Sequence, residues 1–195
     1  MSIPDNPDEA FPIALRYLGL NPASKSQNDL RRAADLLSGL RRYVKKFQSS
    51  DYVGALANGD FCLALGSSAA GLQARTQARE SDNGVDIDYV LPEEGSLLTV
   101  DSLAIPKDAP HGESALAFIN FLLRPEIAAR NTNATKFANS VPASRPWIAK
   151  DISENPAIYP DAAIMSRLFA VPNADPATQK FMAREWARVK TGKYP

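Results

Sequence analysis

The sequence predicts an α/β fold, chiefly from one stretch in its first half. Residues 61–65 form a short, unbroken apolar run, with Asn-Gly-Asp before it and Gly66 after it. This pattern is typical of a strand that is covered on both faces, as in parallel and mixed sheets. Ser67 and Ser68 can then cap a polar helix over residues 72–81. Such a helix N-terminus presents backbone N–H groups at the carboxyl edge of a sheet, where ligands bind in open α/β folds.

The composition is that of a soluble globular protein of one large domain or two small lobes, with 195 residues. Lys plus Arg and Asp plus Glu number 22 each, so no net charge attracts nucleic acid or an anionic membrane. No apolar run approaches the roughly 20 residues of a membrane span, and no signal peptide precedes Pro4.

The single Cys62 and the single His111 exclude an internal disulfide and ordinary zinc or Cys–His catalytic sites within the chain. We expect a buried Cys62 thiol and a His111 exposed in a loop.

The first predicted helix contains Phe11, Leu15 and Leu18 at helical spacing and ends before Gly19. Its first turn contains the carboxylates Asp8 and Glu9, which the helix dipole favours at that end. These two acids therefore either stabilise the helix N-terminus or contact a ligand.

A longer helix is predicted to begin at Asn28 or Asp29 and to carry one apolar stripe. The stripe consists of Leu30, Ala33, Leu37, Leu40, Val44 and Phe47. Because it covers less than three heptads and contains Gly39, it favours packing on a sheet over a coiled coil. Its Arg and Lys residues lie off the stripe and indicate a solvated face rather than a phosphate site. A short helix over residues 51–57 follows.

Two further strands are predicted, over residues 85–89 and 97–105. In the first, apolar residues alternate with Asp86 and Asp88. The second contains Asp101, a carboxylate that is costly to bury unless it is paired or hydrogen-bonded. Asp101 either caps a turn or meets an Arg at a strand end, or it points into a cleft that receives a cation.

The C-terminal part is predicted to be mostly helical. An amphipathic helix is expected over residues 112–123, with short helices over 126–130 and 162–169. Between them lies a loop-rich region, 131–146, in which Phe137 either plugs the core or forms the wall of a cleft. Asp175 and Pro176 are a typical N-cap and first residue of a last helix that ends at Gly192. The residues expected to face inward are Phe181, Met182, Trp186 and Val189.

Several segments together resemble the periplasmic polyamine-binding proteins of ABC importers, the putrescine/spermidine type. The matching segments, in order, are NPDEAF (6–11), YLGLNP (17–22), FQSSDY (47–52), LANGDFC (56–62), PEEG (92–95), AFINFLLRPE (117–126), ENPAIYP (154–160) and REWARVKTGK (184–193). Their order and spacing along essentially the whole chain carry the resemblance.

The resemblance implies a two-lobed periplasmic-binding-protein fold of class II, in which an α/β lobe closes on each side of the ligand. The chain corresponds to the C-terminal portion of such a protein and lacks most of the N-terminal lobe. Residues 1–76 and 131–195 would belong to the second lobe, and 77–130 to a return segment of the first. In relatives, the cysteine matching Cys62 can bridge to one further upstream.

The resemblance also implies which residues contact the ligand. Glu9 and Asp101 match acids that receive ammonium groups, and Phe137 stands where the family usually has Tyr. Ser67 stands in place of a Trp. Two weaker positions are Ala70, where the family has an Asp, and Thr99, which replaces an aromatic residue. Carboxylates at both ends of the ligand and aromatic faces along its middle are what a diamine requires.

The implied function is that of a solute-binding protein that carries a polyamine or related cationic amine to the membrane permease of an ABC importer. The full-length protein would be periplasmic, with no metal, cofactor, nucleic acid or membrane insertion. Since Ala70 removes an acid at a helix N-terminus, a zwitterionic amino-compound is an alternative ligand. A truncated, non-binding fragment is another alternative. An enzyme is disfavoured because no nucleophile–base set is present.

Overall fold

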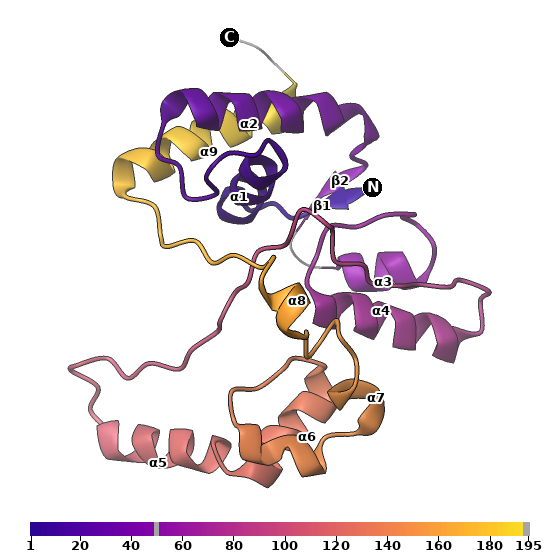
Figure 1. Ribbon diagram of the computed structural model, residues 1–195, viewed down its shortest axis with the longest axis vertical. Coiled ribbons are helices and arrows are strands. Elements are labelled where there is room, and N and C mark those ends of the chain that lie inside the picture. The colour runs from indigo at the N-terminus through magenta and orange to yellow at the C-terminus, as the bar shows by residue number, and fades with distance from the viewer. Residues whose placement is uncertain (49–50, 193–195) are drawn as a thin grey trace. The chain divides into compact units, whose positions relative to one another are not determined.

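The computed structural model describes residues 1–48 and 51–192 (Figure 1). By packing, the chain divides into two compact units. The first consists of Met1–Leu98 with the C-terminal segment from Ile164, and the second of Thr99–Ala163. These bounds differ from those of the expected lobes, 1–76 with 131–195 and 77–130, whose assignment stays a prediction.

Three helices form the main core of the first unit: α1 (Pro7–Tyr17), α2 (Gln27–Leu40) and α9 (Pro176–Thr191). They pack against one another in the upper part of Figure 1. Trp186 of α9 lies edge-on to Phe11 and Phe47, with ring centroids 6.4 and 5.4 Å away. The four residues of α9 that were expected to face inward are buried, as are Phe11 and Leu15 of α1. Ser26 and Asp175 cap α2 and α9 through their side chains.

The predicted long helix ends earlier than its apolar stripe suggests. After Leu40 the chain forms a short 3₁₀ helix, η1 (Arg41–Tyr43), and then the strand β2 (Lys46–Phe47). The expectation of a helix that reaches Phe47 is therefore wrong. Phe47 still packs on the main core, because β2 pairs with a neighbouring strand that holds it there.

The sheet is small and parallel. β1 (Ser2–Ile3) pairs with β2 in the register Ser2 to Lys46 and Ile3 to Phe47. On its other side, Ser2 forms a parallel bridge with Ala64. The predicted strand over residues 61–65 is thus reduced to this bridge. Cys62 is exposed, so the expected buried thiol is wrong, because only Phe61 of this run is deeply buried.

Two further helices, α3 (Tyr52–Ala57) and α4 (Ser68–Ser81), pack on each other below the sheet in Figure 1. Ile87 is buried against alanines of these helices, but the predicted strand over 85–89 forms no ladder with described residues. Of the predicted strand over 97–105, only Leu97 pairs, in a parallel bridge with Phe169. A strand requires a neighbour for its N–H and C=O groups, and most of these residues have none within the described chain.

The second unit contains α5 (Gly112–Leu122), α6 (Pro125–Thr135), the 3₁₀ helix η2 (Pro142–Trp147) and α7 (Lys150–Ser153). The helix α8 (Ala162–Met165) contains the point in the sequence at which the second unit ends and the first resumes. α6 runs further than expected, into the predicted loop 131–146. Asn139 joins α6 to η2: its Nδ2 donates to Thr132 Oγ1 at 2.9 Å and its Oδ1 accepts from Ser144 Oγ at 3.0 Å. His111 is exposed just before α5, as predicted.

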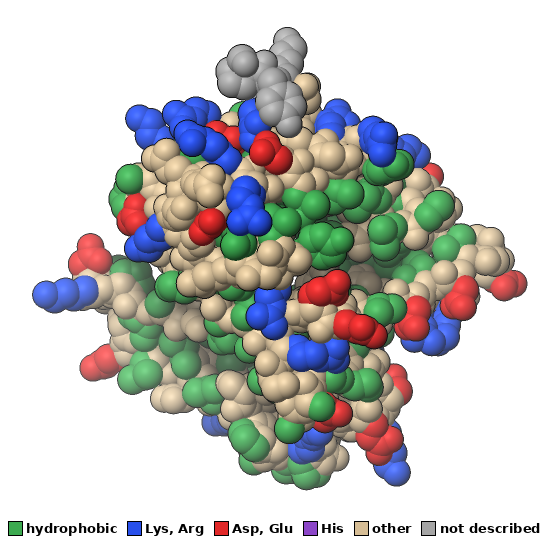
Figure 2. Space-filling view, turned by 45° about the horizontal axis from the view of Figure 1, so that its top comes forward, with side chains coloured by type: hydrophobic (Ala, Val, Ile, Leu, Met, Phe, Trp, Pro, Cys, Tyr) green, Lys and Arg blue, Asp and Glu red, His purple; other side chains and the backbone are tan. Residues whose placement is uncertain are grey.

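On the face shown in Figure 2, Lys and Arg lie among Asp and Glu, in keeping with their equal numbers in the sequence. Arg31 and Arg32 of α2 are exposed, as expected for a solvated helix face. Among the described residues, no helix is long and apolar enough to cross a membrane.

Candidate ligand-binding site

The carboxyl edge of the small parallel sheet gathers several of the predicted site residues. β1 leads into α1, β2 leads toward α3, and the bridged stretch around Ala64 leads into α4. Because the three stretches are parallel, their carboxyl ends lie on one edge of the sheet. Ligands of open α/β sheets bind at this edge.

Glu9 lies in the first turn of α1, directly after β1. It is half-buried, and its Oε1 accepts a hydrogen bond from Asn6 Nδ2 at 2.9 Å. The same Asn6 caps the helix, since its Oδ1 accepts from the Asp8 N–H at 3.0 Å. No Lys or Arg of the described chain forms an ion pair with Glu9, so its partner is a neutral amide and its charge is not compensated by a cation.

Ser67 is the N-cap of α4, as the sequence predicts. Its Oγ accepts from the Ala70 N–H at 3.3 Å, and its own N–H donates to the Tyr52 hydroxyl at 3.3 Å. Two N–H groups at this end of α4 therefore already have partners within the protein. Ala70 lies one turn into the helix and is partly buried.

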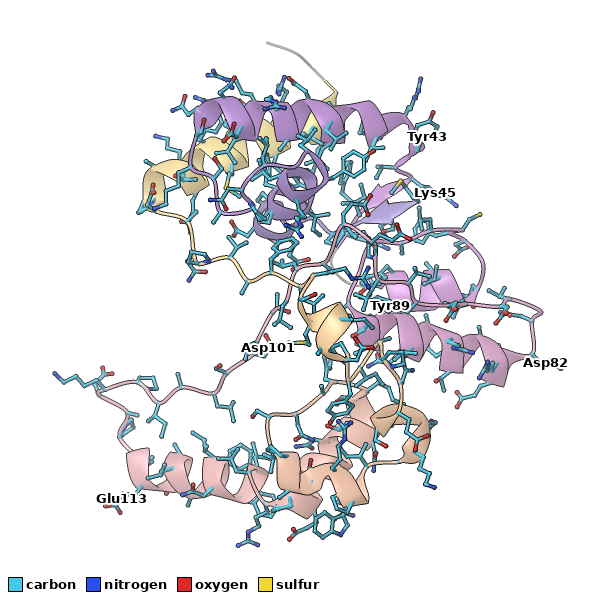
Figure 3. The ribbon with its side chains drawn as sticks, viewed as in Figure 1. Tyr43, Lys45, Asp82, Tyr89, Asp101 and Glu113 are labelled. Carbon is cyan, nitrogen blue, oxygen red and sulfur yellow. The ribbon has the colours of Figure 1, made fainter. Side chains whose placement is uncertain are left out.

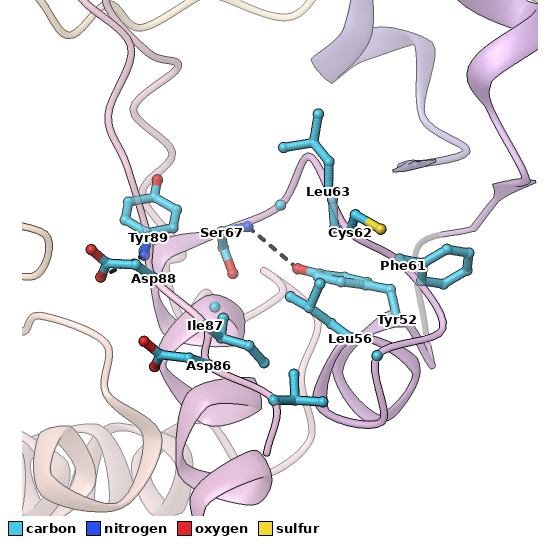
Figure 4. Close-up of a pocket in the computed structure, with 15 residues that line it drawn as sticks. Tyr52, Leu56, Phe61, Cys62, Leu63, Ser67, Asp86, Ile87, Asp88 and Tyr89 are labelled. Carbon is cyan, nitrogen blue, oxygen red and sulfur yellow. Dashed lines mark hydrogen bonds between the residues drawn. The ribbon is translucent and has the colours of Figure 1, made fainter. Parts of the chain in front are cut away.

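A pocket of about 410 Å³ opens beside Ser67, between α3, the start of α4 and residues 85–89 (Figure 4). Tyr52 and Tyr89 provide two of its aromatic surfaces. Burial, and to a lesser extent the neighbouring Tyr52, raises the pKa of the Tyr89 phenol, which stays neutral at ordinary pH. A Cβ at Gly66 would overlap the Tyr52 ring, so glycine is required there for the ring to lie against the chain.

The acids of the predicted strand 85–89 lie at the rim of this pocket. Asp86 and Asp88 are exposed, and Figure 4 shows their carboxylates pointing away from Tyr52. Asp88 Oδ1 is 3.4 Å from Arg75 Nη1 and also accepts from the Tyr89 N–H at 3.0 Å. The carboxylate of Asp88 is thus already paired, while the pocket beside it is lined mainly by apolar and aromatic side chains.

The other predicted site residues belong to the second unit. Asp101 and Thr99 are exposed in a segment without helix or ladder (Figure 3). Asp101 has no hydrogen bond or ion pair to any described residue, so neither the turn cap nor the Arg partner considered for it is present. Phe137 follows α6, and 48% of its surface is exposed. The expected convergence of Glu9 and Asp101 stays a prediction.

The predicted site residues do not include two aromatic residues that line the pocket beside Ser67, Tyr52 and Tyr89. The signal for Tyr89 is the alternation over residues 85–89, which puts it on the same face as Val85 and Ile87, two other residues that line the pocket.

The chain is similar to known bacterial solute-binding proteins along nearly its whole length. Residues 2–160 match the family described as bacterial extracellular solute-binding protein. The putrescine-binding periplasmic protein SpuD of Pseudomonas aeruginosa is 41% identical over 193 residues, which are 99% of this chain and 53% of that protein. The putrescine-binding periplasmic protein PotF of Escherichia coli is 38% identical over 194 residues, 99% of this chain and 52% of that protein.

The fold has solved counterparts. The structure of a putative spermidine/putrescine ABC transporter protein from Listeria monocytogenes aligns with a TM-score of 0.86 at 26% identity, over 98% of this chain and 57% of the other. The chain thus spans about half the length of the relatives it matches. These matches confirm the periplasmic-binding-protein fold expected from the sequence. This chain forms part of that fold.

Proposed function

Because the chain belongs to the family of bacterial extracellular solute-binding proteins, we propose that it forms part of a protein that binds a polyamine, or a related cationic amine, for import. The ligand is held in a cleft between two lobes, which close on it and present it to the membrane permease of an ABC transporter. The complete protein acts in the periplasm. Residues 1–76 and 131–195 form its second lobe, and 77–130 return to the first.

Two observations support an amine as the ligand. The relatives that match along nearly the whole chain are named as putrescine-binding proteins. Glu9 carries the proposal in the structure: it is a half-buried carboxylate at the carboxyl edge of the sheet, hydrogen-bonded to the neutral Asn6 and without a cationic partner among the described residues. A ligand ammonium supplies the missing charge through a charge-assisted hydrogen bond.

The remaining contacts follow the same chemistry. Asp101 is an acid without a partner in the described chain and receives a second ammonium group. Phe137 offers an exposed ring for the methylene chain or for a cation. Ser67 lines the site with a small polar group, and Ala70 and Thr99 contribute only small contacts. No bond of the ligand is broken, in keeping with relatives that are named as binding proteins rather than enzymes.

Isothermal titration calorimetry of the complete protein that carries this sequence, with putrescine and with spermidine, tests the proposal. We expect binding of at least one amine and a loss of about 10- to 100-fold in affinity for Glu9→Gln, since a hydrogen bond to a charged group contributes about 1.5–3 kcal/mol. Glu113→Gln is the matched control, because Glu113 is an exposed acid in the first turn of α5. Absence of binding by the unmodified protein, or equal losses in both variants, would contradict the proposal.

A zwitterionic amino-compound is the second candidate. The observation that favours it is Ala70, which leaves the N-terminal turn of α4 without an acid, so the helix dipole there attracts a carboxylate. Calorimetry with both ligand classes distinguishes the amine from the zwitterion. Tight binding of a diamine with no binding of zwitterionic amino acids would reject the zwitterion as the ligand. Binding of an amine by the complete protein, together with lack of binding of either ligand class by the 195-residue chain alone, would support the truncated, non-binding fragment.

A further inference from the structure

Gln48 is a polar side chain buried at the carboxyl end of β2. The residue is only 8% exposed, and neither its Oε1 nor its Nε2 has a hydrogen-bond partner among the described residues. Buried polar groups are nearly always hydrogen-bonded, because an amide removed from water without a new partner lowers stability. A buried amide with both polar atoms unpartnered is therefore a feature that folding alone does not explain.

The backbone pairing of Gln48 places its side chain on the face of the sheet that is turned away from the main core. The Gln48 N–H donates to the Ile3 carbonyl at 2.9 Å, so the ladder between β1 and β2 continues to this residue. Ile3 and Phe47 pack on the core of α1, α2 and α9. Since successive side chains of a strand point to opposite faces, Gln48 lies on the other face of the sheet. Leu65 likewise packs on the core, so its neighbour Ala64, which is bridged to Ser2 and lines the pocket, lies on the same face as Gln48.

Gln48 also lies at the carboxyl edge of the sheet, the edge at which the helix with Glu9 begins. β1 and β2 are adjacent and parallel, and Glu9 stands in the first turn of the helix that follows β1. Gln48 directly follows β2 at the same edge. A Gln side chain has three rotatable bonds, so its amide can turn toward a group held at this edge without movement of the strand.

We propose that Gln48 is a ligand-binding residue of the amine site. Its Oε1 accepts a hydrogen bond from the ligand ammonium held by Glu9, which adds an acceptor without a second negative charge. An amide suits this role, because a second carboxylate beside Glu9 would repel the first in the unliganded protein. The inference rests on the proposed amine-binding function and adds a residue to it.

The test is the variant Gln48→Met, which keeps the length of the side chain and removes the amide. Because the amide has no hydrogen-bond partner among the described residues, we expect the Tm measured without ligand to stay the same or to rise. We expect the Kd for putrescine or spermidine to increase by about 10- to 100-fold, the effect of a hydrogen bond to a charged group. Differential scanning fluorimetry and calorimetry on the complete protein measure the two quantities.

Gln179→Met is the matched control, since Gln179 is exposed on α9, and it should change neither Tm nor Kd. A lower Tm with unchanged Kd in Gln48→Met would show that the amide serves the fold and would overturn the inference. An unchanged Kd overturns it whatever the Tm does. Absence of amine binding by the unmodified protein would instead remove the proposed function, and the inference with it.

Discussion

Asn6, rather than Asp8 or Glu9, caps the N-terminus of α1. Its Oδ1 accepts the Asp8 N–H and its Nδ2 donates to Glu9. The sequence predicts the helix and places both acids in its first turn, but Asn and Asp are equally good caps and the pattern does not say which one acts. Because Asn6 takes this role, the Glu9 carboxylate is not needed as the cap.

Asp5 joins the start of the chain to its last helix. Its Oδ1 accepts from Trp186 Nε1 at 2.7 Å and pairs with Lys190 Nζ at 2.8 Å. In Asp5→Ala the buried Trp186 loses its acceptor, which we expect to lower the free energy of unfolding by about 1–3 kcal/mol. Asp5→Asn keeps an acceptor for Trp186 and should cost less, since an exposed ion pair contributes little. Urea denaturation followed by tryptophan fluorescence compares the two, and equal losses would contradict the role of the Trp186 hydrogen bond.

The same carboxylate makes stability depend on pH. Hydrogen bonds from Lys190, and then from Trp186, lower the pKa of Asp5 in the folded protein. An unfolded Asp has a pKa of about 3.9. The contribution of Asp5 is therefore complete above that value and is lost as the pH falls through the lower folded pKa. The difference in Tm between the unmodified protein and Asp5→Asn should shrink below pH 4, and a constant difference down to pH 2 would contradict this linkage.

The sequence predicts the parts of the candidate site that depend on local pattern alone. The positions of Glu9 in the first turn of α1 and of Ser67 at the N-cap of α4 follow from the local pattern, whereas the ligand contacts that the resemblance implies for Asp101 and Phe137 stay predictions. The burial of Gln48 cannot be predicted in this way, because it depends on the pairing of β2 with β1, two strands more than forty residues apart in sequence.

Helices were predicted more reliably than strands for a physical reason. The capping residues and apolar spacing that define α1 and α9 are local, and these helices begin and end close to where the pattern places them. The polar helix α4 ends at Ser81 as predicted but begins at Ser68, directly after its predicted cap and four residues before the predicted start. The apolar runs over 61–65 and 97–105 have the composition of strands, but a strand also needs a neighbour. Within the described chain these runs form only single bridges, at Ala64 and Leu97.

The N-terminal turn of α4 provides a test of ligand choice. In Ala70→Asp, an acid enters the third position after the cap, where Ser67 already accepts the Ala70 N–H. The helix dipole favours this acid, so we expect stability to rise by about 0.3–1 kcal/mol. If the ligand is an amine, the added charge should tighten putrescine binding and weaken binding of zwitterions. Calorimetry with both ligand classes measures the change, and tighter binding of a zwitterion would contradict it.

The two units of the chain differ in how their helices are buried. In the first, α1, α2 and α9 enclose a core that includes Phe11, Leu15 and Trp186. In the second, α5 has no buried residue, and its apolar side chains are largely exposed. The sequence predicts α5 from its amphipathic spacing, but spacing shows only that a helix has an apolar face and not what covers that face.

This contrast predicts unequal local stability within one molecule. α1 and α5 have the same length, 11 residues, so differences in helix length do not enter the comparison. Short helices are marginal in water without packing, and amides in segments with few buried contacts exchange through local opening. We therefore expect the α5 amides of this chain to exchange with solvent much faster than those of α1, whose protection should approach that of global unfolding. Hydrogen–deuterium exchange read by mass spectrometry on peptides covering 7–17 and 112–122 measures both. Equal protection of the two helices would contradict the prediction and show that the apolar face of α5 is covered.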